Sequence, residues 1–87
     1  MLDVKAMRTF VALREGGSLV AAAERLHLTQ SALSHQVKAL KSHFHTPLYV
    51  RKSRPLRFAS AGERLLDLAN EVLPRISATE QRLRHIP

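Results

Sequence analysis

The stretch TQSALSHQVKALKSHF, residues 29–44, holds the pattern from which the fold can be predicted. Its apolar residues recur at steps of four, three and four positions, which places them on one side of an α-helix. They are Leu33, Val37, Leu40 and Phe44. The other side carries hydroxyls, an imidazole and amines without an acid, namely Ser31, Ser34, His35, Lys38, Lys41 and Ser42. With Thr29 as its amino-terminal cap, this helix is predicted to pack on a core and to present its polar face to a negatively charged partner.

The positive charge of the chain is concentrated around this helix. The 87 residues have a formal net charge of +7, and no acid lies between Glu24 and Glu63. That gap contains Arg25, Lys38, Lys41, Arg51, Lys52, Arg54 and Arg57. A surface of one sign raises the local concentration of a polyanion, so nucleic acid is favoured as the partner over a solvated basic face without one.

Two shorter helices are predicted before this stretch. The first runs over residues 4–15 and is stopped by Gly16-Gly17. The second runs over residues 19–26, with Ser18 as its cap. Small alanines on one side of the second helix allow another helix to approach closely, which indicates ordinary core packing.

Only three residues, His27, Leu28 and Thr29, separate the second helix from the third. So short a link forces the two helices to cross at a steep angle. His27 is expected in the left-handed conformation, which histidine tolerates better than most residues, and Leu28 is expected in the core. Residues 18–44 are therefore predicted to form a helix-turn-helix, in which helix 30–44 is the recognition helix that enters the major groove of DNA.

After Phe44 the apolar pattern changes from a helical period to a period of two. Residues 48–51 and 55–58 both alternate in this way, which predicts a short β-hairpin over residues 48–58. The turn lacks Asn-Gly, so a loop longer than two residues is expected. Its basic residues Arg51, Lys52 and Arg54 suit a phosphate or the minor groove, and a solvated loop is the alternative. The hairpin would be the wing of a winged helix-turn-helix.

A long helix is predicted to follow, over residues 60–87, with Ser60 and Glu63 as a capping box. Apolar residues at alternating steps of four and three, with one polar position, form a heptad seam typical of helix pairing. The predicted dimer contacts are Leu65, Ala69, Val72, Ile76 and Leu83. Pro74 is expected to kink this helix without ending it.

A second apolar stripe, with Leu66 and Leu73, lies beside the seam. One stripe can pack on the domain while the other meets a partner helix. A single amphipathic helix folded onto the domain is the alternative. The predicted organisation is a mainly α winged helix-turn-helix over residues 1–59, made of three helices and a short hairpin, and a linker and dimerisation helix over residues 60–87.

A set of positions spread along the whole chain has a characteristic spacing: Ala22-Ala23, Leu26, Gln30-Ser31-Ala32-Leu33-Ser34, Leu40, Leu48, Arg51 and Ala61-Gly62. This spacing resembles that of LysR-type transcriptional regulators. The runs PLYVRKSRPLRF and LANEVLP resemble most the branch of the family that regulates methionine biosynthesis. The resemblance implies a sequence-specific regulator that binds a palindromic operator in double-stranded DNA as a homodimer through the long helix, with a tetramer of the full-length protein also allowed.

The resemblance also implies which residues act and what lies outside this chain. The base-edge and phosphate contacts carry over onto Thr29, Gln30, Ser31, Ser34, His35, Lys38, Arg51, Lys52 and Arg54. Family members carry a separate effector-binding domain, and in the methionine branch its effector is homocysteine. No cofactor is therefore expected in this chain.

Three positions depart from the usual family pattern. Lys41 stands where glutamate is usual, which adds to the basic face. His45 stands where glycine is usual and is expected to stop the helix at some strain. Ala59 replaces a threonine just before the long helix, and Ser60 is expected to take over as the cap.

Other classes of function are less well supported by the sequence. His43 and His45 have no acid beside them, so no metal site is expected, and no phosphate loop or activated nucleophile predicts an enzyme. The lack of cysteine, signal peptide and membrane span suits a cytoplasmic protein. A non-specific nucleic-acid-binding module and a helical protein-interaction domain remain as alternatives, although the low aromatic content argues against stacking on single strands.

Overall fold

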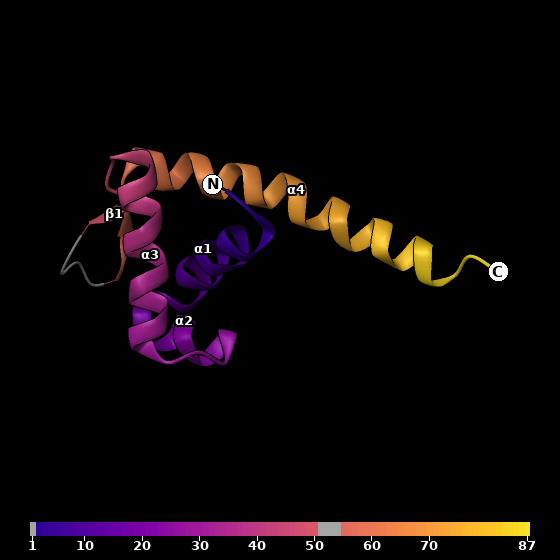
Figure 1. Ribbon diagram of the computed structural model, residues 1–87, viewed down its shortest axis with the longest axis horizontal. Helices are drawn as coiled ribbons and strands as arrows, with labels where there is room; N and C mark the ends of the chain where they lie inside the picture. Colours follow the sequence, from indigo (N-terminus) through magenta and orange to yellow (C-terminus); the bar gives the residue numbers. More distant parts are fainter. Residues whose placement is uncertain (1, 51–54) are drawn as a thin grey trace.

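The computed structural model describes residues 2–50 and 55–87. Its elements are α1 (Val4–Gly16), α2 (Leu19–Leu26), α3 (Gln30–Phe44), β1 (Tyr49–Val50), β2 (Arg57–Phe58) and α4 (Ser60–Arg84). The first three helices and the hairpin gather at one end of the molecule, and the far half of α4 extends away from them (Figure 1). The predicted mainly α winged helix-turn-helix, with a long helix after it, is confirmed.

Local capping bonds begin the first three helices. The amide of Ala6 donates to Oδ1 of Asp3 at 2.8 Å, and the amide of Ala21 donates to Oγ of Ser18 at 3.1 Å. Thr29 caps α3 in the same way, because its Oγ1 accepts from the amide of Ala32 at 3.0 Å. The predicted caps at Ser18 and Thr29 are therefore confirmed. Each bond satisfies an amide that the first turn of a helix leaves without a partner.

Left-handed residues end these helices and set the turns between them. Gly17 ends α1 with φ 76°, His27 ends α2 with φ 56°, and His45 ends α3 with φ 54°. The left-handed conformation of the two histidines confirms the sequence prediction. This conformation strains a residue that has a Cβ. Leu28, which follows His27, is half-buried and lies outside the buried core, so its prediction as a core residue was wrong.

The core lies where the inward faces of the helices meet. Phe10 and Leu13 of α1 and Leu33 of α3 are fully buried, and Val37 and Leu40 are buried beside them. The predicted inward face of α3 is thus confirmed except at Phe44, which is 41% exposed. Because α3 ends at Phe44 and the chain turns away at His45, no further helical turn covers this ring.

One buried polar contact joins α1 to α3. Thr9 is only 2% exposed. Its hydroxyl has a single proton, which it can donate either to the carbonyl oxygen of Lys5 at 2.9 Å or to Oε1 of Gln36 in α3 at 3.2 Å. A hydrogen bond between helices fixes rotation about the helix axis more strictly than apolar contact does. It therefore helps to determine which side of α3 faces outward.

The predicted hairpin is present and is tied to the start of α2. Strands β1 and β2 are antiparallel, with Tyr49 opposite Phe58 and Val50 opposite Arg57. The amide of Leu56 donates to the carbonyl oxygen of Gly17 at 3.0 Å. This bond places the wing beside the turn between α1 and α2. The predicted contact residues Arg51, Lys52 and Arg54 lie outside the described part of the chain.

The predicted capping box at the start of α4 was wrong. Ala59 is the cap residue and provides no side-chain bond, while Ser60 is already the first helical residue. Pairing with the hairpin causes this, because the amide of Ala59 donates to the carbonyl oxygen of Leu48 at 3.1 Å and holds Ala59 extended. The carboxylate of Glu63 forms an ion pair with Arg14 of α1, rather than reaching back to the cap.

A serine at position 59 should therefore stabilise the domain. Ala59→Ser supplies the missing acceptor for the first turn of α4, so we expect a gain of about 1 kcal/mol in the free energy of unfolding. For a domain of this size that raises the melting temperature by about 4–8 °C. Thermal unfolding followed by circular dichroism measures it. Ser60→Ala is the matched control and should be nearly neutral, and a loss of stability in that variant would restore Ser60 as the cap.

The first half of α4 packs on the domain, which corrects part of the predicted dimer seam. Leu65 and Ala69 are 5% and 0% exposed and belong to the core, so they are not available to a partner helix. Val72 is half-buried and packs against the same core. Ile76 is half-buried without belonging to the core or to the residues packed against it, and Leu83 is 63% exposed.

The second stripe packs on the domain as well. Leu66 is 4% exposed, and Leu73 is half-buried against the core. Helix α4 continues through Pro74 to Arg84, as predicted. Its 25 residues span about 37 Å, which is longer than the domain can cover. The remaining apolar seam is therefore on the far half of the helix.

Candidate nucleic-acid interface

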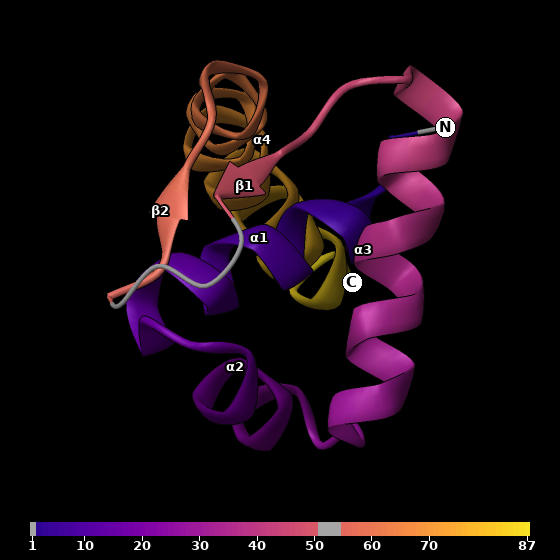
Figure 2. The ribbon, with the colours of Figure 1, turned by 90° about the vertical axis from the view of Figure 1, so that its left-hand side faces the viewer.

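The polar face of α3, the start of α2 and the wing line one hollow on the surface. From α3 it is lined by Gln30, Ser31, Ser34, His35, Val37, Lys38 and Lys41. From the other elements it is lined by Gly17, Ser18, Leu19, Val20, Pro47, Leu48, Tyr49 and Leu56. Seen from this side, α3 runs down the right, with the hairpin at the upper left and α2 at the lower left (Figure 2). We refer to this hollow as the α3–wing groove.

The groove brings together five of the predicted contact residues. Gln30, Ser31, Ser34, His35 and Lys38 all line it. They share one side of α3, because the opposite side is held inward by buried leucines and valine. A side chain that lines this groove can contact a molecule bound between α3 and the wing.

Thr29, which was also predicted to contact DNA, has a structural role in this fold. Its hydroxyl caps α3 and it does not line the groove. It is nevertheless exposed at the start of the helix, where the amino-terminal end carries a partial positive charge. Its effect on binding would therefore include the stability of the first turn of α3.

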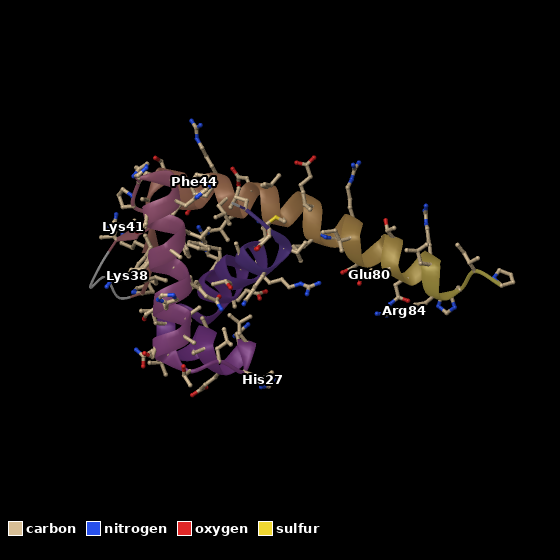
Figure 3. The ribbon with its side chains drawn as sticks, in the orientation of Figure 1. His27, Lys38, Lys41, Phe44, Glu80 and Arg84 are labelled. Atoms are coloured by element: carbon tan, nitrogen blue, oxygen red, sulfur yellow. The ribbon has the colours of Figure 1, made fainter. Side chains whose placement is uncertain are left out.

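The groove has a positive field that acids in the described part of the chain do not neutralise. Within residues 2–50 and 55–87, ion pairs join Arg14 to Glu63 and Arg25 to Glu15, the second at 3.6 Å. Neither pair includes Lys38 or Lys41. These two lysines are exposed and extend from the same outward side of α3 (Figure 3). Their charges are available to an anionic partner.

Sequence reasoning did not find the part of the groove that other elements supply. Ser18 and Val20 come from the start of α2, and Tyr49 comes from β1. Val20 is 53% exposed although it is apolar. The bond between Leu56 and Gly17 brings these elements together, and no local pattern reveals such a bond. The one usable signal in the sequence is the helix-turn-helix spacing, which places the start of the second helix near the third.

Across residues 2–50 and 55–87 there is no cluster of three histidines, cysteines or acids that could hold a metal ion. In the same residues, no helix combines the length and the apolar character that crossing a membrane requires.

Residues 4–63 match the family described as "Bacterial regulatory helix-turn-helix protein, lysR family". The match includes α1, α2, α3, the wing and the start of α4. The chain belongs to the LysR family. The resemblance inferred from residue spacing is therefore confirmed, and the LysR fold accounts for the helix-turn-helix and the wing.

Two curated relatives carry the name HTH-type transcriptional regulator MetR. This LysR-family chain is 52% identical to the protein from Haemophilus influenzae over 98% of the chain, and 57% identical to that from Escherichia coli K12 over 93% of the chain. It covers 28% and 26% of those two proteins, respectively, and so spans about a quarter of their length. These relatives are regulators, in agreement with the prediction that the chain is not an enzyme.

A solved structure agrees with the fold over the whole domain. The DNA-binding domain of BenM, in a crystal structure of its complex with benA site 1 DNA, superposes with a TM-score of 0.88 at 27% identity. The alignment covers 99% of this LysR-family chain and 100% of the BenM chain. The likeness therefore extends through α4 as well as the winged helix-turn-helix.

Proposed function

We propose that this chain is the sequence-specific DNA-binding part of a LysR-type transcriptional regulator. Helix α3 would lie in the major groove with Gln30, Ser31, Ser34 and His35 near base edges, and the wing would lie on the backbone or in the minor groove. The observation that carries the proposal is the α3–wing groove, which is lined by polar side chains of α3 and by Lys38 and Lys41. Among residues 2–50 and 55–87, no acid lines the groove and neither lysine has an ion pair. Phosphate contacts would provide affinity and the base contacts specificity.

The regulated genes are proposed to be those of methionine biosynthesis. This rests on the identity of about half of the residues with the MetR proteins, over nearly the whole chain. The relatives are much longer than this chain, so an effector domain that binds a homocysteine-type molecule is proposed for the full-length protein. The BenM domain in complex with DNA supports duplex DNA as the partner.

The active form is proposed to be a homodimer joined along α4. With Leu65 and Ala69 in the core, the contacts would be Val72, Ile76 and Leu83 on the far half of the helix. An antiparallel pair would direct both recognition helices outward, toward half-sites one helical turn or a multiple of it apart. The full-length protein could also associate further into a tetramer.

A selection from a random duplex pool tests the function directly. The best duplex and a scrambled version of it are labelled, and fluorescence anisotropy measures affinity for both over a series of salt concentrations. We expect tight binding of the selected duplex and weak binding of the scrambled one, both falling as salt rises. Equal affinity for the two would indicate a non-specific nucleic-acid-binding module. Binding of neither would indicate a protein-interaction domain.

Substitutions in α3 should separate base contacts from phosphate contacts. Gln30→Ala and Ser34→Ala should each cost about 1–3 kcal/mol and relax one position of the selected site. Lys38→Gln should weaken all sequences alike, because a phosphate contact carries no base information. Repeating the duplex selection with each variant measures this. A changed base preference for Lys38→Gln with an unchanged one for Gln30→Ala would reverse the assignment.

A further inference from the structure

A second hollow lies at the carboxyl end of α3, and it contains residues to which no contact has been assigned above, among them Lys41, Ser42 and His45. It is lined by His35, Lys38, Ala39, Lys41, Ser42, His45, Thr46 and Pro47. His35, Lys38 and Lys41 line both this hollow and the α3–wing groove. The outward side of α3 is therefore one continuous surface, and Lys41 stands where its two hollows meet.

The charge of this surface selects an anion. Lys41 is exposed and forms no ion pair with any acid in the described part of the chain. Its neighbours in the hollow are a second lysine, two imidazoles and the hydroxyl of Ser42. A hydroxyl and an ammonium group together suit a phosphate, which accepts hydrogen bonds and carries negative charge.

The length of α3 indicates which phosphate this would be. The helix has 15 residues and is about 22 Å long, whereas the major groove is about 12 Å wide. If α3 crosses the groove with its amino-terminal residues at the base edges, its carboxyl-terminal turns extend beyond the groove. Lys41 lies 11 residues after Gln30, or about 16 Å along the axis. That distance brings it to the backbone that borders the groove.

We propose that Lys41, supported by Ser42 and His45, binds a backbone phosphate where α3 leaves the major groove. This inference rests on the proposed function and adds to it a contact that the wing does not make. The competing role is structural, because a cation in the last turn of a helix is stabilised by the partial negative charge of that end. The two roles predict different effects of the lysine on the affinity for DNA and on its salt dependence.

The test compares Lys41→Gln with Arg8→Gln. Both substitutions remove one positive charge, and Arg8 is exposed on α1 and lines neither hollow. Affinity for the selected and the scrambled duplexes is measured over a salt series. We expect Lys41→Gln to weaken both duplexes by the same factor and to reduce the slope of log affinity against log salt by about 0.9 per bound chain. Arg8→Gln should leave the slope as in the parent.

Single methylphosphonate substitutions in the duplex then locate the contact, because each removes the charge of one phosphate. The parent should lose affinity when the phosphate that borders the half-site is replaced. The Lys41→Gln variant should bind this modified duplex as well as it binds the unmodified one, because it has already lost the contact. The Lys41→Gln variant could instead keep the salt slope and the phosphate scan of the parent and lose only thermal stability. That result would show that the lysine merely stabilises α3. A changed base preference would make it a base contact instead. If the parent binds neither duplex, the proposed function fails together with this inference.

Discussion

Gly62→Ala is expected to destabilise the domain by about 3 kcal/mol, at the upper end of what overpacking usually costs. Gly62 is buried in the first turn of α4, and a Cβ there would overlap the carbonyl oxygen of Leu48 and lie 3.1 Å from Cδ1 of Phe58. The Leu48 oxygen cannot move aside easily, because it accepts the amide of Ala59 at 3.1 Å. The added methyl group must push α4 away from the hairpin and the core.

Helix propensity alone predicts the opposite sign for this substitution. Alanine is favoured over glycine inside a helix by about 1 kcal/mol, so a gain of stability would refute the close packing. Thermal unfolding followed by circular dichroism should show a fall of about 12–24 °C in the melting temperature. Gly17→Ala is the comparison, because Gly17 has open space around it and only the strain of φ 76° opposes a side chain there. It should cost less, about 1–2 kcal/mol.

A double substitution on the far half of α4, Ile76→Asp with Leu83→Asp, is expected to split the proposed dimer. Neither residue belongs to the core of the domain, so the fold should remain intact. Two aspartates in an apolar helix pair would be buried without partners, which a dimer of this size cannot offset. Affinity for the selected duplex should fall about a hundredfold or more, since each chain then binds a single half-site.

Sedimentation velocity and fluorescence anisotropy on the same samples measure both effects. The control is Ser77→Asp with Gln81→Glu, which adds the same charge on the other side of the same helix, where both residues are exposed. That variant should remain a dimer and lose only the affinity that two added negative charges cause. A double aspartate variant that still sediments as a dimer and binds the same site would exclude Ile76 and Leu83 from the interface.

The sequence by itself determined the features that depend on neighbouring residues. The caps at Ser18 and Thr29 act on amides three residues away, and the turns at His27 and His45 depend on the backbone of one residue. The inward face of α3 follows from a helical period. The acid-free segment is a property of composition. These interactions are short in sequence, so a local pattern contains all the information they need.

The tertiary structure decided what covers each apolar face. The seam on α4 was read correctly as apolar, but its period could not show that the domain covers Leu65 and Ala69 and leaves Leu83 exposed. The same limit applies to Phe44, which continues the apolar stripe of α3 yet is exposed. A period identifies a face, whereas the surface that buries it comes from elements distant in the chain.

At the start of α4, bonds to residues distant in the chain form in place of a capping box that the local sequence predicts. Ser60 and Glu63 have the spacing of a capping box, but the carbonyl oxygen of Leu48 holds Ala59 in the cap position and Arg14, 49 residues away, takes the carboxylate of Glu63. The α3–wing groove has the same origin, since the amide of Leu56 and the carbonyl oxygen of Gly17 bring the wing to the start of α2. Contacts of this kind form only when the core packs, so only the tertiary structure identifies their partners.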